Sequence, residues 1–177
     1  MKKFLSRYLF AFIMLPALPL ILLFDPGRGA KMVGNLAFSF REMLSVLPPI
    51  FILIGLLDVW VSRETMVRYM GEGSGVKGVL LSFFLGSAAA GPLYAAFPIA
   101  GVFLKKGVSF TNLMIFLGAW STTKIPMFLF ELSAMGAPFA VTRLLVNIPV
   151  IIVIAVAMQA VIDPEEKERL YRAAEKP

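Results

Sequence analysis

Two apolar runs decide the fold of this chain: residues 78–104, GVLLSFFLGSAAAGPLYAAFPIAGVFL, and residues 110–132, FTNLMIFLGAWSTTKIPMFLFEL. At about 1.5 Å per helical residue, each run is long enough to cross a hydrocarbon layer of roughly 30 Å. Both are interrupted near the centre, where a Phe-Leu-Gly triplet is followed by a proline that cannot donate a helical hydrogen bond. The residues predicted to break the helices are Gly86, Gly91, Pro92, Gly118 and Pro126. Backbone groups freed in lipid need protein or water partners, so the paired breaks predict a site inside the membrane.

The composition predicts an all-α, polytopic membrane protein with one domain. The chain has 177 residues, 59% of them hydrophobic, and a mean hydropathy of +0.83, with its charges in short islands between apolar runs. The net charge of +6 is carried by basic residues that flank the apolar runs in ones and twos. That pattern is typical of a membrane surface, so we expect a lipid bilayer as partner and no nucleic acid.

Cysteine and histidine are both absent from the sequence. This removes thiolate and imidazole metal ligands, disulfides and thiol nucleophiles. The glycine-rich segment 71–75 lacks the Gly-Lys-Ser/Thr ending of a phosphate loop and is interpreted as a plain loop. We therefore expect no cofactor, no metal and no enzymatic activity.

Five spans are predicted along the chain. A retained first transmembrane helix occupies 1–24, a turn follows at 25–29, and 33–60 holds an interfacial helix that runs into the second span. The broken-helix core covers 78–132, where each run either spans or re-enters, and the last span covers 141–162. The tail 163–177 begins with Asp163 as N-cap and Pro164 in the first turn, which predicts a short solvated helix.

The positive charges do not orient this five-span arrangement. One side receives seven basic residues, Lys2, Lys3, Arg7, Arg63, Arg68, Lys77 and Arg143. The other side receives nine, Arg28, Lys31, Arg41, Lys105, Lys106, Lys167, Arg169, Arg172 and Lys176. Such a balance allows insertion in both orientations, which gives the hypothesis of a homodimer of two oppositely inserted copies, arranged as the inverted repeats of longer transporters are.

Lys124 is the most informative candidate residue. In a span over 110–132 it lies eight residues from the end, about 12 Å deep, so its charge should face a partner or a wet cavity. One interpretation makes Lys124 a counter-ion for an anionic solute, or half of a pair with Asp58 or Glu131. The other places it near an interface because the broken helix re-enters.

Further polar side chains surround the two breaks. Hydroxyls that either bind solute or recap freed backbone belong to Ser87, Ser121, Thr122 and Thr123. Tyr94, Trp120 and Asn147 are candidates to line the same cavity, or to pack and hydrogen-bond between helices. Glu131 and Asp58 are candidate proton or ion carriers, although Glu131 also fits a plain charge at a span's end. Helix N-termini after the breaks, together with Lys124, favour an anionic or polar solute.

The sequence resembles the predicted permease family that includes the ArsP and YraQ membrane proteins, especially its half-length members. The resemblance covers about 50–162 and is carried by the glycine-rich segment 71–75, Gly86-Ser87, the segment 92–100 and Leu104-Lys105-Lys106-Gly107. It implies a transporter in a prokaryotic cytoplasmic membrane that must dimerise to match relatives with two repeats. Some relatives export trivalent organoarsenicals and carry cysteines before the proline. Here Ala88, Ala89 and Ala90 occupy that place, so thiol-based handling is not carried over.

The first hypothesis is therefore a small permease that works as a homodimer, with a midplane site formed by two broken helices. The alternatives are a non-transporting accessory or scaffold subunit, whose breaks only shape helix packing, and a channel. An intramembrane enzyme ranks last. The substrate-binding candidates are Lys124, Ser87, Ser121, Thr122, Thr123, Tyr94 and Asn147.

Overall fold

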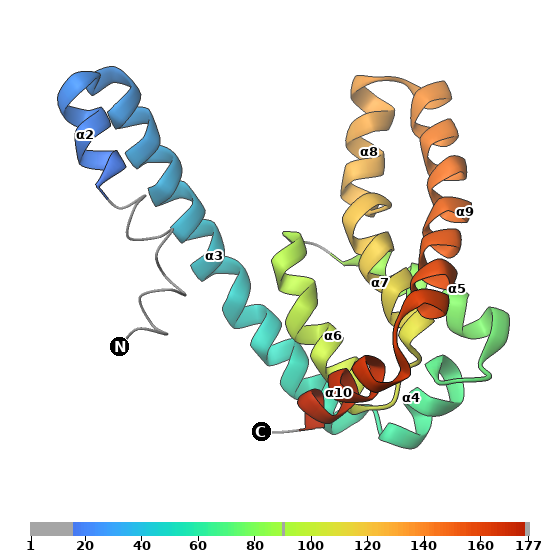
Figure 1. The fold of residues 1–177 in the computed structure, drawn as a ribbon. Coiled ribbons are helices and arrows are strands. Elements are labelled where there is room, and N and C mark those ends of the chain that lie inside the picture. The colour runs from blue at the N-terminus through green and yellow to red at the C-terminus, as the bar shows by residue number, and fades with distance from the viewer. Residues whose placement is uncertain (1–15, 90, 176–177) are drawn as a thin grey trace. The chain divides into compact units, whose positions relative to one another are not determined.

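The computed structural model describes residues 16–89 and 91–175, and every regular element in these ranges is a helix (Figure 1). This confirms the all-α prediction. The helices are α2 (Ala17–Phe24), α3 (Pro26–Trp60), α4 (Arg63–Met70), α5 (Gly75–Ala88), the 3₁₀ turn η1 (Leu93–Ala95), α6 (Ala96–Lys105), α7 (Phe110–Thr122), α8 (Ile125–Ala134), α9 (Ala137–Val161) and α10 (Pro164–Glu175).

Two compact units divide the chain, residues 1–48 and 49–177, and each is considered by itself. In the first, the predicted turn after Asp25 is wrong, because α3 begins at Pro26. Pro26 needs no helical hydrogen bond at this position, and Asp25 Oδ1 accepts the backbone N–H of Arg28 at 3.0 Å. The predicted interfacial helix and second span form one helix, α3. Most of the predicted first span, 1–15, lies outside the described residues.

Among the residues that the structure describes, three helical segments are long and apolar enough to cross a membrane: Pro26–Leu57, Phe110–Ala134 and Ala137–Val161. The last two confirm apolar segments expected from the sequence. The run 78–104 instead folds as two shorter helices, α5 and α6, on either side of residues 89–92. Neither is long enough to cross a layer of roughly 30 Å, since the 14 residues of α5 rise only about 21 Å.

Helices α5 and α6 form a hairpin whose two ends lie together. The backbone N–H of Ser109, just before α7, donates to the carbonyl oxygen of Met70 at 2.9 Å. Asn112 Nδ2 donates to the same oxygen at 2.9 Å and to Ser74 Oγ at 3.0 Å. The chain therefore leaves this end through α5, returns to it through α6, and starts α7 beside the start of α5.

Small residues bring α5 against α7. Gly78, Ser82 and Gly86 recur at every fourth position of α5, and all three are buried. A Cβ on Gly86 would lie 2.5 Å from the Phe116 carbonyl oxygen and 2.7 Å from the Ala119 Cβ. Gly86, predicted to break the helix, thus lies inside α5 and permits the close backbone approach that membrane helices use for packing.

The other face of α7 packs on α6 and α9. The Phe116 ring lies 4.9 Å from that of Phe103 in α6 and 5.5 Å from that of Trp120, measured between centroids. Gly118, also predicted to break the helix, lies inside α7, where an added Cβ would meet Ile151 Cγ2 of α9 at 2.8 Å. Both glycines of the Phe-Leu-Gly triplets are therefore sites of close helix contact.

The predicted terminal helix is confirmed as α10, with Asp163 Oδ1 accepting the N–H of Glu165 at 2.8 Å. It packs against α6 (Figure 1). Tyr171 donates its hydroxyl to the Val108 carbonyl oxygen at 2.7 Å, and Lys167 pairs with Glu72 at 2.7 Å. Burial raises the pKa of Tyr171, and the nearby charge of Glu72 raises it further.

Gly86→Ala should destabilise the protein by about 1–3 kcal/mol, because the new methyl group collides with backbone and Cβ atoms of α7. Thermal unfolding in detergent measures the effect. Gly101→Ala, in α6 with nothing within 4 Å of an added Cβ, is the matched control and should be neutral or stabilising. Equal melting temperatures for the two variants would contradict this packing.

Tyr171→Phe should lower stability near neutral pH by about 0.5–1.5 kcal/mol through loss of the hydrogen bond to Val108. Because the folded-state pKa lies above the unfolded value, this contribution is complete below about pH 10 and disappears as the pH rises through the folded-state pKa. The stability difference between wild type and Tyr171→Phe, measured from pH 7 to 11, should therefore shrink at the alkaline end.

Candidate functional site

The two helix interruptions meet at one carbonyl group. The chain leaves α5 at Ala88 and resumes helical structure at Leu93, while α7 and α8 are separated by Thr123 and Lys124. Lys124 Nζ donates to the Gly91 carbonyl oxygen at 2.8 Å, and Trp120 Nε1 donates to the same oxygen at 3.3 Å. We call these three residues, Gly91, Trp120 and Lys124, the junction.

Gly91 can present this carbonyl because of its backbone conformation. Its φ of +119° lies in a region that residues with a Cβ rarely adopt. Pro92 follows in an extended conformation as N-cap of η1 and has no N–H to satisfy. Pro126 occupies the first turn of α8, where a proline costs no hydrogen bond, so the second interruption precedes it and is centred on Thr123 and Lys124.

The predicted hydroxyls of Thr122 and Thr123 bond to carbonyls one helical turn earlier, and those of Ser87 and Thr123 bond to each other; the Ala119 carbonyl also accepts the Thr123 N–H at 2.9 Å and so is not left free. Thr122 Oγ1 donates to the Gly118 carbonyl at 2.9 Å, and Thr123 Oγ1 donates to the Ala119 carbonyl at 3.1 Å. With its single hydrogen used, Thr123 accepts from Ser87 Oγ at 2.8 Å, which adds a second link between the two interruptions. These three contacts fit the structural interpretation of the hydroxyls.

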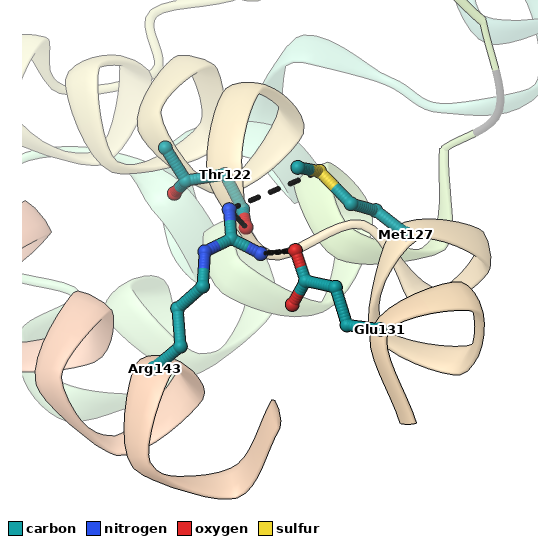
Figure 2. Close-up of polar contacts among 4 residues, drawn as sticks. All are labelled: Thr122, Met127, Glu131 and Arg143. Atoms are coloured by element: carbon teal, nitrogen blue, oxygen red, sulfur yellow. Dashed lines mark hydrogen bonds and ion pairs between the residues drawn. The ribbon is translucent and has the colours of Figure 1, made fainter. Parts of the chain in front are cut away.

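A buried ion pair adjoins the α7–α8 interruption (Figure 2). Glu131 of α8 is only 6% exposed and binds Arg143 of α9. The same guanidinium donates to the Thr122 carbonyl oxygen at 3.2 Å, near the end of α7, and contacts Met127 Sδ at 3.9 Å. Arg143 thus neutralises a buried carboxylate and satisfies a carbonyl that the interruption leaves without a helical partner.

Arg143 was not among the residues predicted for the site, because the sequence pattern places it with the surface charges. A signal was present, because Glu131 and Arg143 lie six residues before and after Ala137, next to the turn at Gly136. Two antiparallel helices joined by a tight turn bring such positions opposite each other. Glu131 was one of two carboxylates considered as a partner for Lys124, whereas in the structure the ammonium group of Lys124 donates to the neutral Gly91 carbonyl.

The remaining predicted residues are spread out. Asn147 lines a small cavity of about 10 Å³ together with Thr122, Thr123, Glu131 and Arg143, about the room of a single water. Ser121 is exposed, and Tyr94 in η1 is 42% exposed. Asp58 lies in α3, and its side chain is outside the described part. Within the described ranges, no three carboxylates gather in a way that would hold a metal.

A larger cavity of about 620 Å³ borders the junction. Its walls come from the second half of α3 and from α4, α5, α6 and α7, and they are almost wholly apolar. Leu85, Ala88, Ala89 and Trp120 are among its lining residues, so the cavity extends to the end of α5 and to one donor of the junction. Volume and lining resemble those of sites for small apolar ligands.

These features define an integral membrane protein built of apolar helices, with a polar contact between two helix interruptions. The comparison with family models agrees: residues 35–176 match the family ArsP_1, described as predicted permease, and the chain belongs to that family. This confirms the resemblance seen in the sequence. The comparisons with curated proteins and with solved structures gave no match.

Arg143→Met should destabilise the protein by about 3–5 kcal/mol, because it leaves the buried carboxylate of Glu131 without a counter-charge. The double variant Glu131→Gln/Arg143→Met should recover part of that loss. Chemical denaturation in detergent of wild type, the two single variants Arg143→Met and Glu131→Gln, and the double variant gives the coupling energy between the two side chains. Additive losses from the two single changes would show that the pair makes no energetic contact.

Proposed function

We propose that this protein is a permease in which the junction is the point where a solute binds and the pathway opens. The observation that carries this proposal is the shared carbonyl of Gly91, which accepts from both Trp120 and Lys124. These two hydrogen bonds join the interruptions of two apolar helices. A polar solute could replace the Gly91 carbonyl as the acceptor of both. Membership of the predicted permease family supports the same function.

The position of Lys124 fits a site deep in the bilayer. It lies 14 residues after Phe110 and 10 residues before Ala134 in the apolar segment 110–134, about 21 Å and 15 Å by helical rise. Its ammonium group donates to a neutral carbonyl, so its positive charge is solvated without being neutralised there. A cation held at such depth favours a solute that brings negative charge or a strong acceptor.

The apolar cavity indicates the rest of the solute. Because Ala88, Ala89 and Trp120 are among its lining residues, a molecule in the cavity can bring one end close to the junction. We infer a solute with an apolar body of small-ligand size and one polar or anionic group. That group would take over the hydrogen bonds that Lys124 and Trp120 now give to Gly91.

Transport would follow from exchange of these hydrogen bonds. When the donors turn to the solute, the link between residues 89–92 and the end of α7 weakens, and α6 can move relative to α7 and α8. Discontinuous helices that carry a midplane site and move against neighbouring elements are the usual design of secondary transporters. We propose a homodimer as the working unit, because a chain of this length offers few helices to enclose a pathway alone.

The accessory-subunit alternative is favoured by one observation. The hydroxyls of Ser87, Thr122 and Thr123 all have partners within the protein, either a helix carbonyl or one another, which is what a purely structural role requires. The two readings differ at Lys124, since a scaffold tolerates loss of its charge if the helices still pack.

Lys124→Met should reduce uptake into proteoliposomes at least tenfold, because it removes both the donor to Gly91 and the charge facing the solute. The solute panel should contain small aromatic and aliphatic carboxylates, phosphonates and neutral analogues, each tested with and without a proton or sodium gradient. Lys124→Arg should retain part of the activity. Lys77→Met, at an exposed position of α5, is the matched control and should transport as wild type.

The melting temperature of Lys124→Met must equal that of wild type, since a folding defect would also reduce uptake. Uptake by Lys124→Met equal to that of Lys77→Met, for a solute that wild type transports, would refute the role of the junction. Absence of any transport across the panel would favour the accessory subunit.

A further inference from the structure

We propose that the protein inserts in a single orientation, with the end that carries α4, α10 and the two ends of the α5–α6 hairpin facing the cytoplasm. The inference goes beyond transport and does not depend on it. It follows from where the hairpin puts the positive charges, and it concerns residues 49–175, which belong to one compact unit.

The hairpin changes which charges share a side. A spanning run over 78–104 would place Lys105 and Lys106 across the membrane from Arg63, Arg68 and Lys77. The structure brings them together instead, because the Ser109 N–H donates to the Met70 carbonyl at 2.9 Å. Lys106 Nζ also reaches the Val61 carbonyl, just after α3, at 2.5 Å. The end of α3, the start of α5 and the end of α6 therefore lie at one end of the unit.

Helix α10 lies at this same end. It packs on α6, its Tyr171 hydroxyl donates to Val108 beside Ser109, and Lys167 pairs with Glu72 in the loop before α5. Eight basic residues thus collect here: Arg63, Arg68, Lys77, Lys105, Lys106, Lys167, Arg169 and Arg172. We call this set the basic end.

The opposite end of the unit is the turn between α8 and α9, and it is devoid of basic residues. From Ile125 to Thr142 the chain carries neither lysine nor arginine. The only other basic residues between 49 and 175 are Lys124 and Arg143, whose contacts are internal, with the Gly91 carbonyl and with Glu131. Even if both are assigned to the turn end, the ratio is eight to two.

Such an asymmetry decides orientation, because lysine and arginine close to helix ends are retained on the cytoplasmic side, whereas acidic residues have little influence.

A single orientation has a consequence for assembly. Two copies inserted the same way are related by an axis along the membrane normal, so a homodimer is parallel. The antiparallel dimer considered from the sequence arose from a count that assumed five crossings. The structure supports a parallel arrangement in its place.

The natural absence of cysteine makes a direct test available. Single cysteines are introduced at four exposed sites, as Val76→Cys, Lys105→Cys, Met135→Cys and Ala173→Cys. Intact cells expressing each full-length variant are treated with a membrane-impermeant maleimide, before and after permeabilisation. We expect Met135→Cys to label at least tenfold more strongly than the other three in intact cells, and the other three to label only after permeabilisation.

Other patterns overturn the proposal. Labelling of Lys105→Cys from the side opposite Val76→Cys would show that the hairpin crosses the membrane. Partial labelling of all four sites in intact cells would show two orientations, and a fully inverted pattern would show that the basic end faces outward. A second experiment moves positive charge from the basic end to the turn between α8 and α9. In one variant that combines Arg68→Gln, Lys77→Gln, Ser133→Lys and Met135→Lys, a reporter fused to the C-terminus should become detectable on both sides of the membrane. Because none of these outcomes involves uptake, a negative transport result leaves this proposal standing.

Discussion

The structure depends on the requirement that every backbone polar group inside a bilayer finds a partner. Two apolar segments of this chain are interrupted, and the carbonyl of Gly91 at the first interruption receives hydrogen bonds from Trp120 and Lys124 at the second. The Ser87–Thr123 contact adds another link. Each interruption is therefore satisfied by the other, which ties the α5–α6 hairpin to α7 and α8.

Close packing makes this exchange geometrically feasible. The small residues Gly78, Ser82 and Gly86 let α5 approach α7, and Gly118 lets α9 approach from another side. With the helix axes so near, the end of α5 comes within hydrogen-bond distance of residues 120–124. Arg143 supports the same region from α9 by binding Glu131 and the Thr122 carbonyl. The polar groups near the junction are thus arranged by helix contacts rather than by loops.

The apolar cavity and the basic end give this arrangement a direction. The cavity is lined in part by α5 and α7 and borders the junction, and the basic end lies where α5 starts and α6 finishes. In the proposed permease, the place where the solute binds and the sense of insertion would both follow from one hairpin that turns back.

Much was readable in the sequence, because hydropathy and proline placement act locally. Apolar composition predicted an all-helical membrane protein. The runs 110–132 and 141–162 lie in the long apolar helical segments Phe110–Ala134 and Ala137–Val161, and Asp163-Pro164 begins the terminal helix as expected. The family was recognised from glycine and proline spacing. Lys124 was correctly singled out as a residue needing a partner, since a buried charge must be solvated wherever it lies.

What the sequence could not decide is where segments distant along the chain meet. Whether residues 78–104 cross or turn back depends on the Met70–Ser109 contact, which joins residues 39 positions apart and leaves no periodic signal. The glycines of the two Phe-Leu-Gly triplets were predicted to break helices, because the sequence alone does not distinguish a glycine that allows close helix packing from one that ends a helix. The pairing of Arg143 with Glu131, and of Lys124 with Gly91, likewise required three-dimensional proximity. The tertiary structure alone therefore decided the partners of the charges and the side to which each loop belongs.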